Sequence, residues 1–141
     1  MSIAYSNKFN ISLPNREYFS DFLVNFDAHP DSMQIVRNIN EKAIIRSIRN
    51  LLLTNKYERM FQPQIGCDLR NQLFEPMTSQ SAIALQRTIE TVIERYEPRA
   101  GLLEVLVTPF EEQNLYVIKI TFFIANNQTP TSFVVQLSRA R

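Results

Sequence analysis

Glycine, cysteine, histidine and tryptophan are scarce in this sequence. Its 141 residues contain two glycines, one cysteine, one histidine and no tryptophan. Gly66 and Gly101 stand far apart, whereas a loop that cradles phosphate with backbone N–H groups needs several neighbouring glycines. One histidine and one cysteine cannot supply the ligands of an ordinary zinc site. The composition therefore excludes glycine-rich nucleotide loops and common zinc sites, and no cofactor or metal is expected.

The single cysteine and the single histidine give little indication of chemistry. Because Cys67 is alone, no disulfide within the chain is possible, and a reducing compartment is the simpler interpretation. Cys67 has no neighbouring histidine and stands among apolar residues, which favours a buried, unreactive thiol. His29 lies in "DAHPDS" before a proline. We expect it to be a loop residue in solvent or at an interface, not a general base.

Neither charge nor hydrophobicity indicates a nucleic acid or membrane partner. The chain has 15 basic and 14 acidic side chains, without the basic excess of a nucleic-acid-binding protein. The longest apolar runs, "LLL" at 51–53 and "FFIA" at 122–125, are far too short to span a bilayer. The N-terminal "MSIAYSNKFN" does not resemble a signal peptide. We therefore expect a protein made and folded in the cytoplasm.

The first part of the chain differs from the rest. Residues 1–32 show no sustained hydrophobic period and contain prolines, asparagines and serines, which is typical of an extended arm or loop. Aromatic residues in such an arm need a surface to pack on, either of this domain or of a neighbour. They are Tyr5, Phe9, Tyr18, Phe19, Phe22 and Phe26. The sequence therefore predicts an arm, 1–32, and a single domain, 33–141, in which 33–39 can form a short strand.

The first helical pattern covers 41–55. At 100° per residue its apolar side chains fall on one arc and its basic side chains on the opposite side. The apolar residues are Ile44, Ile45, Ile48, Leu51 and Leu52. Asn40 is a plausible N-cap. Leu53 falls on the basic side, where it would be exposed unless a partner covers it.

The second helical pattern covers 79–96, with Thr78 or Ser79 as the expected N-cap. Pro98 lacks an N–H group and disfavours the helical conformation at the preceding residue. The helix should therefore end near Tyr96.

Three segments near the C-terminus alternate with period two, at 103–107, 115–124 and 131–137. Turn residues at 111–114 and 126–130 separate them, which predicts an antiparallel meander. With the two helices on one face of this sheet, the predicted fold class is α+β. In the first strand Leu103, Val105 and Val107 are expected on one face. The face away from the helices is too apolar to be wholly exposed, since it would carry Leu115, Val117, Phe123 and Val134.

Between the helices, "ERMFQPQIGCDLRNQLFEP" has no long period. It is expected to be an ordered loop with a short helical turn near 69–74. Gly66 would allow a tight turn, with Phe61, Ile65 and Leu69 packed under the helices.

Paired carboxylates would be needed for glycoside hydrolysis. The candidates are Asp68, Glu75, Glu97, Glu104, Glu111 and Glu112. Spacing along the chain pairs none of them, and 14 acidic residues in 141 produce chance neighbours. Because there is also no tryptophan to stack on a sugar, a hydrolase is weakly supported.

The stretch "YEPRAG" places an acid and a base on either side of Pro98. In one interpretation Arg99 donates hydrogen bonds to the carbonyl groups at the helix C-terminus, and Glu97 is solvated. In the other, Pro98 stiffens the chain so that both charges project in a fixed geometry. The planar guanidinium of Arg99 would then bind a carboxylate or carbonyl group of another protein. Spacing alone favours the local interpretation.

Several motifs occur together in the order and at the spacings of a known family. They are "RSIRN", "FQPQIGCDL", "LFE" and "YEPR", within a stretch from about Ala43 to Pro109. The chain resembles the small baseplate wedge protein, or sheath initiator, of contractile-tailed phages of the T4 type. The family is shared with type VI secretion and contractile bacteriocin baseplates and is often labelled lysozyme-like.

The resemblance implies an α+β fold and a structural, non-enzymatic role in the baseplate of a virion assembled in the host cytoplasm. It also implies contacts with larger baseplate wedge proteins, with the tail sheath and with hub or tube proteins. The protein would be a monomer alone and present in several copies in the baseplate. Its role would be to join the inner baseplate to the sheath and to template the first sheath ring.

Two partner contacts are expected on this basis. The Glu-Pro-Arg motif of the family contacts the helical bundle of the larger wedge protein, and Glu97, Pro98 and Arg99 match that motif. A three-stranded meander also has two open edges, and the strand at 131–138 is expected to accept a strand of a sheath subunit. The residues of that edge are Phe133, Val134, Val135, Gln136 and Leu137.

Glu97→Ala and Arg99→Ala are accordingly expected to leave folding nearly intact and to stop wedge assembly. Two other functions stay open at this point. A peptidoglycan-degrading, lysozyme-like enzyme would need a carboxylate pair in a cleft. A soluble adaptor would bind a host regulatory protein.

Overall fold

The computed structural model describes residues 18–138 apart from 24, 25, 27, 125 and 126. The arm's first seventeen residues, with Tyr5 and Phe9, lie outside the described part. The helices are α1 (Glu41–Leu53), α2 (Leu69–Gln72) and α3 (Ser79–Tyr96), with a short 3-10 turn, η1 (Glu111–Gln113). The strands are β1 (Ser20–Phe22), β2 (Arg37–Ile39), β3 (Ala100–Phe110), β4 (Leu115–Ile124) and β5 (Asn127–Ser138).

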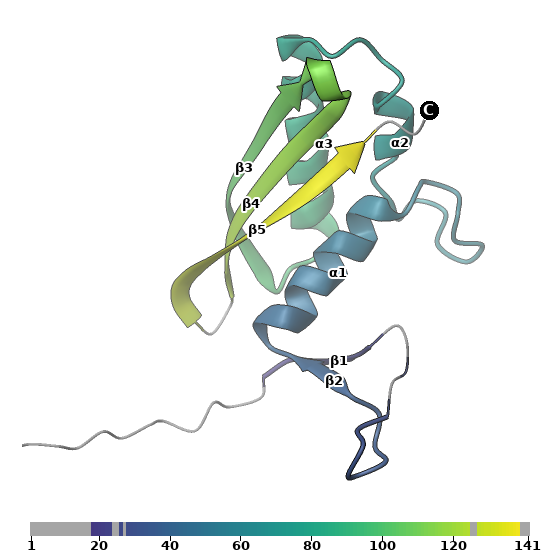
Figure 1. The fold of residues 1–141 in the computed structure, drawn as a ribbon, viewed down its shortest axis with the longest axis vertical. Helices are drawn as coiled ribbons and strands as arrows, with labels where there is room; N and C mark the ends of the chain where they lie inside the picture. The colour runs from purple at the N-terminus through teal and green to yellow at the C-terminus, as the bar shows by residue number, and fades with distance from the viewer. Residues whose placement is uncertain (1–17, 24–25, 27, 125–126, 139–141) are drawn as a thin grey trace, which may run out of the picture.

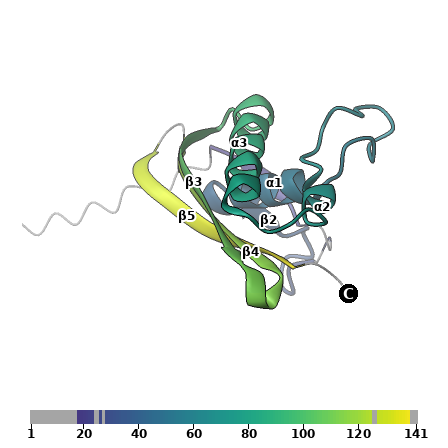
Figure 2. The same ribbon diagram turned by 90° about the horizontal axis from the view of Figure 1, so that it is seen from above.

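The main body has two layers, a sheet and a helical layer (Figure 1). The sheet is an antiparallel meander in the order β3-β4-β5, as the period-two pattern predicts. All three helices lie on the same side of it (Figure 2), and α3 packs mainly on β3. The α+β fold is confirmed. No helix among the described residues has the length and apolar character that a bilayer crossing requires.

The core lies between the sheet and the helices. The largest fully buried side chains are Tyr116, Phe122, Ile44, Ile48, Leu52, Leu85, Ile89, Ile93, Ile118, Ile120, Val105 and Val135. They come from the predicted apolar stripe of α1, from the buried face of α3 and from alternate positions of the strands. Phe122 meets Phe133 edge to face, with ring centroids 6.1 Å apart.

One position in β3 departs from the predicted alternation. The pairing with β4 shifts between Leu102 and Glu104, which inserts an extra residue as a β-bulge. Leu103 is therefore 50% exposed, whereas Val105 and Val107 are buried as predicted. The placement of Leu103 with the two valines is wrong because period two holds only within an unbroken ladder.

The far face of the sheet carries apolar side chains. Leu106 and Val134, which both face Lys119 of β4 in the ladder, are 50% and 53% exposed. Leu115, Val117 and Phe123 are half-buried on the same face. This face is thus only partly polar, as the sequence predicts.

Asn40 occupies the N-cap position of α1, but its side chain makes no capping hydrogen bond. Its Oδ1 accepts instead from the backbone N–H groups of Tyr18 and Phe19, at 2.9 and 3.2 Å. The Asn40 N–H also donates to the Phe19 carbonyl at 2.7 Å. Asn40 therefore ties the arm to the start of α1, a long-range role that local capping patterns do not predict.

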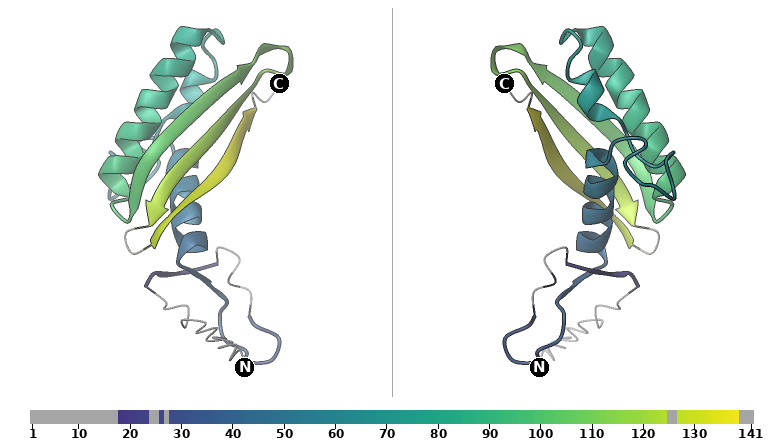
Figure 3. Two further views of the ribbon diagram at one scale, coloured as in Figure 1. Left: turned by 90° about the vertical axis from the view of Figure 1, so that its left-hand side faces the viewer. Right: turned by 90° about the vertical axis from the view of Figure 1, so that its right-hand side faces the viewer.

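The strand predicted within 33–39 forms, but it is shorter, at Arg37–Ile39, and it does not join the main sheet. β2 pairs with β1 in a separate two-stranded sheet at the start of α1, away from the main sheet (Figure 3). This hairpin has strands on both sides of the predicted boundary between residues 32 and 33. The division into arm and domain stays a prediction.

α3 begins and ends where the sequence predicts. Thr78 forms a capping box with Ser81, whose backbone N–H donates to Thr78 Oγ1 at 3.2 Å. The helix ends at Tyr96, and Glu97 is its C-cap. The next two residues, Pro98 and Arg99, turn the chain into β3.

The loop from Thr54 to Ile65 closes tightly at its base and is exposed at its tip. Gly66 has φ +140°, and a Cβ there would lie 2.7 Å from the Thr54 carbonyl oxygen. The tight turn predicted at Gly66 is confirmed. Leu69 is buried and Ile65 packs against the core, but Phe61 is 98% exposed. The prediction that Phe61 packs under the helices is wrong, because the loop bends away from the body.

Candidate functional site

Glu97 lies inside the protein at the junction of α3 and β3. Only 2% of the residue is exposed, which is exceptional for a carboxylate. Arg99 donates two hydrogen bonds to it, from Nε to Oε1 at 2.5 Å and from Nη2 to Oε2 at 2.8 Å. Ser47 of α1 donates a third, from Oγ to Oε2. The carboxylate thus connects the turn after α3 to the middle of α1.

Arg99 forms the outer part of this cluster. Its side chain is 33% exposed, and its guanidinium lies over the ring of Phe19, 5.7 Å from the centroid. Phe19 is the arm residue whose backbone is held by Asn40. We call the group of Ser47, Glu97, Arg99 and Phe19 the corner cluster. It joins α1, the α3–β3 turn and the arm at one point.

The local sequence explains how two neighbouring charges meet in this way. The Glu97 N–H still donates to the carbonyl of Ile93, as in the last turn of the helix. Pro98 then stops the helix, and the Ala100 N–H donates to the Glu97 carbonyl at 3.1 Å. This tight reversal places the side chains on either side of Pro98 next to each other, while Pro98 itself is exposed.

Both interpretations of "YEPRAG" are therefore wrong in their treatment of Glu97. The carboxylate is neither solvated nor projecting toward a partner, because it is buried and bonded to Arg99 and Ser47. Of Glu97, Pro98 and Arg99, only Pro98 and the outer part of Arg99 reach the surface. Whether they contact another protein stays a prediction.

The environment of Glu97 shifts its pKa. Burial raises the pKa of this carboxyl, but the hydrogen bonds from Arg99 and Ser47 and the positive charge of Arg99 outweigh burial, so the pKa lies below 4.5. The hydrogen bonds with Glu97 likewise raise the pKa of Arg99. Glu97 is therefore an ionised structural partner. A general acid would need the opposite shift.

Glu97→Gln tests this electrostatic contribution. Because the folded state lowers the pKa of Glu97, the stability it supplies is complete above its ordinary value of 4.5 and is lost as pH falls through the folded value. At neutral pH the variant should unfold with a free energy about 1 to 3 kcal/mol below wild type. The gap should narrow near pH 3, because this pH lies below the ordinary value of 4.5 and the charge of Glu97 then stabilises the folded state less. Urea titrations at the two pH values measure this, and a gap independent of pH would contradict it.

The predicted edge residues lie in β5, which is an edge strand of the sheet as expected. Val135 and Leu137 point into the core and are buried, so only their backbone is available at the edge. Val134 is 53% exposed on the far face, beside exposed Gln136. Phe133 is half-buried against Phe122. None of the described strands pairs with the outer side of β5.

The candidate carboxylates are mostly dispersed. Asp68 accepts a hydrogen bond from Asn71 Nδ2 at 2.8 Å. Glu75 and Glu111 line one small pocket of about 280 Å³, and both are exposed. Glu97 is engaged in the corner cluster. The pocket that Glu75 and Glu111 share has no aromatic residue among its described lining.

Cys67 and His29 behave as predicted. Cys67 is fully buried and unpaired, and burial raises the pKa of its thiol to about 12. His29 is exposed in the turn between β1 and β2, where its Nδ1 accepts from the Asp31 N–H. The described residues contain no cluster of histidine, cysteine and acidic side chains that could hold a metal ion.

Sequence reasoning missed Ser47 and Phe19. Ser47 is the one hydroxyl in "RSIRN", half-buried on a helix whose other inward residues are apolar, and that position was the available signal. Phe19 gave no comparable signal, because nothing in the arm indicates which surface it covers.

Comparisons with known proteins agree with this architecture. The fold is similar to that of a candidate tail lysozyme from Geobacter sulfurreducens, with a TM-score of 0.65 and 24% identity over 72% of this chain and 92% of that one. It is also similar to a chain of the anti-feeding prophage baseplate, with a TM-score of 0.59 and 20% identity over 84% and 83% of the two chains. At these identities the likeness shows the fold alone. The molecule thus has a small α+β fold that also occurs in the anti-feeding prophage baseplate.

Sequence similarity then gives the family. The pattern described as "Baseplate wedge protein gp25" matches residues 39–129. Baseplate wedge protein gp25 of Enterobacteria phage T4 is 36% identical over 93 residues, which are 66% of this chain and 70% of the T4 protein. The chain belongs to the baseplate wedge protein gp25 family and is a structural component of a phage tail baseplate.

Proposed function

We propose that this protein joins the inner baseplate to the tail sheath and templates the first sheath ring. The observation that carries the proposal is that none of the described strands pairs with the outer side of β5, in a member of a baseplate wedge family. An edge strand offers a row of unpaired N–H and C=O groups, which a strand from another subunit can complete. A ring of such edges would set the position and orientation of the first sheath subunits.

A groove beside the end of β5 supports this arrangement. It has a volume of about 500 Å³ and lies between the end of α1, α2 and the last residues of β5. Leu53 and Phe74, which line it, are 46% and 64% exposed. An added strand would direct alternate side chains toward this groove. It would also cover Leu53, the apolar residue that the helical pattern places on the basic side of α1.

Paired proline substitutions test the edge. Successive residues of a strand direct their N–H groups to opposite sides, so of Val134→Pro and Val135→Pro one removes a donor to β4 and the other removes an outward donor. The variant that keeps the β4 ladder should fold and should bind sheath protein at least about tenfold more weakly, since each buried hydrogen bond left unmade costs about 1 to 3 kcal/mol. Circular dichroism identifies the folded variant, and sedimentation with purified sheath protein measures binding. Wild-type binding by that variant would contradict the proposal.

We assign the second contact, with the helical bundle of the larger wedge protein, to the surface of the corner cluster. Pro98 and the outer part of Arg99 would form the contact, and buried Glu97 would hold the Arg99 fork in place. A planar guanidinium fixed on one side keeps donors for a carbonyl or carboxylate of the partner at low entropic cost.

Pro98→Glu separates this contact from stability. Pro98 is exposed, so the variant should fold with a free energy of unfolding within about 1 kcal/mol of wild type. A bulky charge at the contact should prevent co-purification with the larger wedge protein after co-expression. Gln80→Glu, on an exposed position at the start of α3, is the matched control and should co-purify normally. A complex that forms equally well with both variants would remove the corner from the interface.

A further inference from the structure

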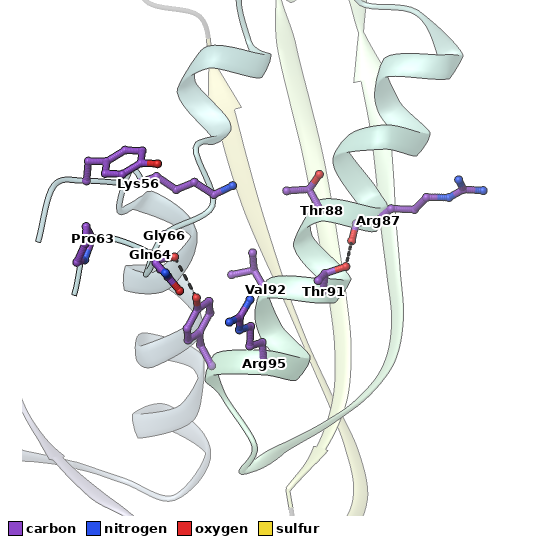
Figure 4. Close-up of a pocket in the computed structure, with 11 residues that line it drawn as sticks. Lys56, Pro63, Gln64, Gly66, Arg87, Thr88, Thr91, Val92 and Arg95 are labelled. Carbon is purple, nitrogen blue, oxygen red and sulfur yellow. Dashed lines mark hydrogen bonds between the residues drawn. The ribbon is translucent and has the colours of Figure 1, made fainter.

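A cleft lies between the loop after α1 and the outer side of α3 (Figure 4). Its volume is about 490 Å³. The loop and successive turns of α3 line it, and its lining includes Lys56, Gln64, Arg87, Val92, Arg95 and Tyr96. Neither the edge of β5 nor Pro98 and Arg99 lines it.

The charges of this cleft are all of one sign. Lys56 extends from the loop toward α3, and Arg95 points from α3 toward the loop (Figure 4). Arg87 lines one end with its guanidinium directed away. No aspartate or glutamate is among the described residues that line the cleft. Two cations that converge across a concave surface without a carboxylate create a site for an anion.

The walls of the cleft are held before any ligand arrives. Tyr96 Oη donates to the Gln64 carbonyl at 3.0 Å, which fastens the loop to the end of α3. Gly66 fixes the base of the loop, and Val92 forms a buried apolar floor. The Arg95 guanidinium lies 5.5 Å from the centre of the Tyr96 ring, which favours an orientation over the aromatic wall.

We propose that this cleft binds an extended acidic segment of a partner protein, with its carboxylates on Lys56 and Arg95. The tip of the same loop favours a protein over a nucleic acid. Tyr57, Met60 and Phe61 are 82%, 92% and 98% exposed there, and such aromatic and methionine side chains are enriched in protein interfaces. The net charge of +1 also argues against a polyanion. This site is additional to the proposed sheath and wedge contacts and does not depend on them.

A titration of the isolated full chain tests the site. The probe is a short blocked peptide of alternating glutamate and alanine, added to ¹⁵N-labelled protein and followed by NMR. Amide shifts are expected at Gly66, Val92 and Tyr96, and they should weaken as salt rises. Arg95→Glu should lower the affinity about tenfold or more, because it reverses one of two converging charges. Arg49→Glu, at an exposed position of α1 outside the cleft, should leave the affinity unchanged.

The control ligands separate the alternatives. The glutamine–alanine counterpart of the peptide should produce no shifts in the cleft. The proposal is overturned if the acidic peptide shifts amides all over the surface, or binds Arg95→Glu as well as wild type. It is also overturned if inorganic phosphate or a short oligonucleotide shifts the cleft amides and the acidic peptide does not. Because no sheath or wedge protein is present, none of these outcomes bears on the proposed baseplate role.

Discussion

Arg99→Ala is expected to lower the free energy of unfolding by about 2 to 4 kcal/mol, and by more than Glu97→Ala does. Removing Arg99 leaves a buried carboxylate with Ser47 as its remaining hydrogen-bond donor. Breaking a buried ion pair in this way costs about 3 to 5 kcal/mol in general, and the partial exposure of Arg99 lets water reduce that cost. The burial of Glu97 thus revises the expectation that either substitution leaves folding nearly intact.

Glu97→Ala should cost only about 1 to 2 kcal/mol, because the arginine left behind is one-third exposed and can turn toward water. The double variant has neither charge, so no unpaired charge stays behind. Its loss of free energy of unfolding should therefore be smaller than the sum of the two single losses. Urea unfolding of the three variants at neutral pH measures the order. Arg49→Ala, at an exposed position of α1, should stay within about 0.5 kcal/mol of wild type. Equal losses for Glu97→Ala and Arg99→Ala would show that the carboxylate is not buried in solution.

Gly66→Ala is expected to be at least as destabilising as Arg99→Ala and to lower the free energy of unfolding by about 3 kcal/mol or more. The new Cβ would lie 2.7 Å from the Thr54 carbonyl oxygen and 2.7 Å from the carbonyl carbon of Asn55. Both are backbone atoms beside the Cys67–Thr54 hydrogen bond, so the loop must move as a whole. A φ of +140° adds backbone strain for any residue with a side chain. The thermal midpoint of unfolding is the simplest measurement.

Gly101→Ala is the matched control for this prediction. A Cβ at Gly101 would meet its nearest neighbours, in Phe123, at 3.7 and 3.8 Å, which is ordinary contact. Replacing a glycine inside β3 also reduces the entropy of the unfolded chain, so Gly101→Ala should be neutral or slightly stabilising. Similar losses for both alanine variants would contradict the geometry described for the loop.

Elements set by local chemistry could be predicted from the sequence. The apolar stripe of α1, the Thr78 cap and the stop at Pro98 depend on residues within a few positions of one another, and the structure confirms each. The period-two strands also have a local signal, which failed only at the bulge around Leu103. Family motifs added what spacing could not, since the baseplate wedge family was identified from their order.

Features that depend on distant contacts could not be predicted. Asn40 looks like a helix cap by its neighbours, yet its side chain holds the arm. Glu97 looks exposed beside a proline, yet Ser47 and Arg99 offer enough hydrogen bonds for burial. Phe61 looks like a core residue, but the loop that carries it leaves the body. For Asn40 and Glu97 the deciding partner lies on another element, and for Phe61 the path of the whole loop decides, none of which a single sequence identifies.

The most direct measurement is a cryo-EM reconstruction of an assembled tail that contains this chain. We expect a strand of the adjacent sheath subunit hydrogen-bonded along the outer side of β5, from Phe133 to Leu137, with Leu53 covered. A reconstruction in which water surrounds that side of β5 and the sheath contacts another surface would contradict the account.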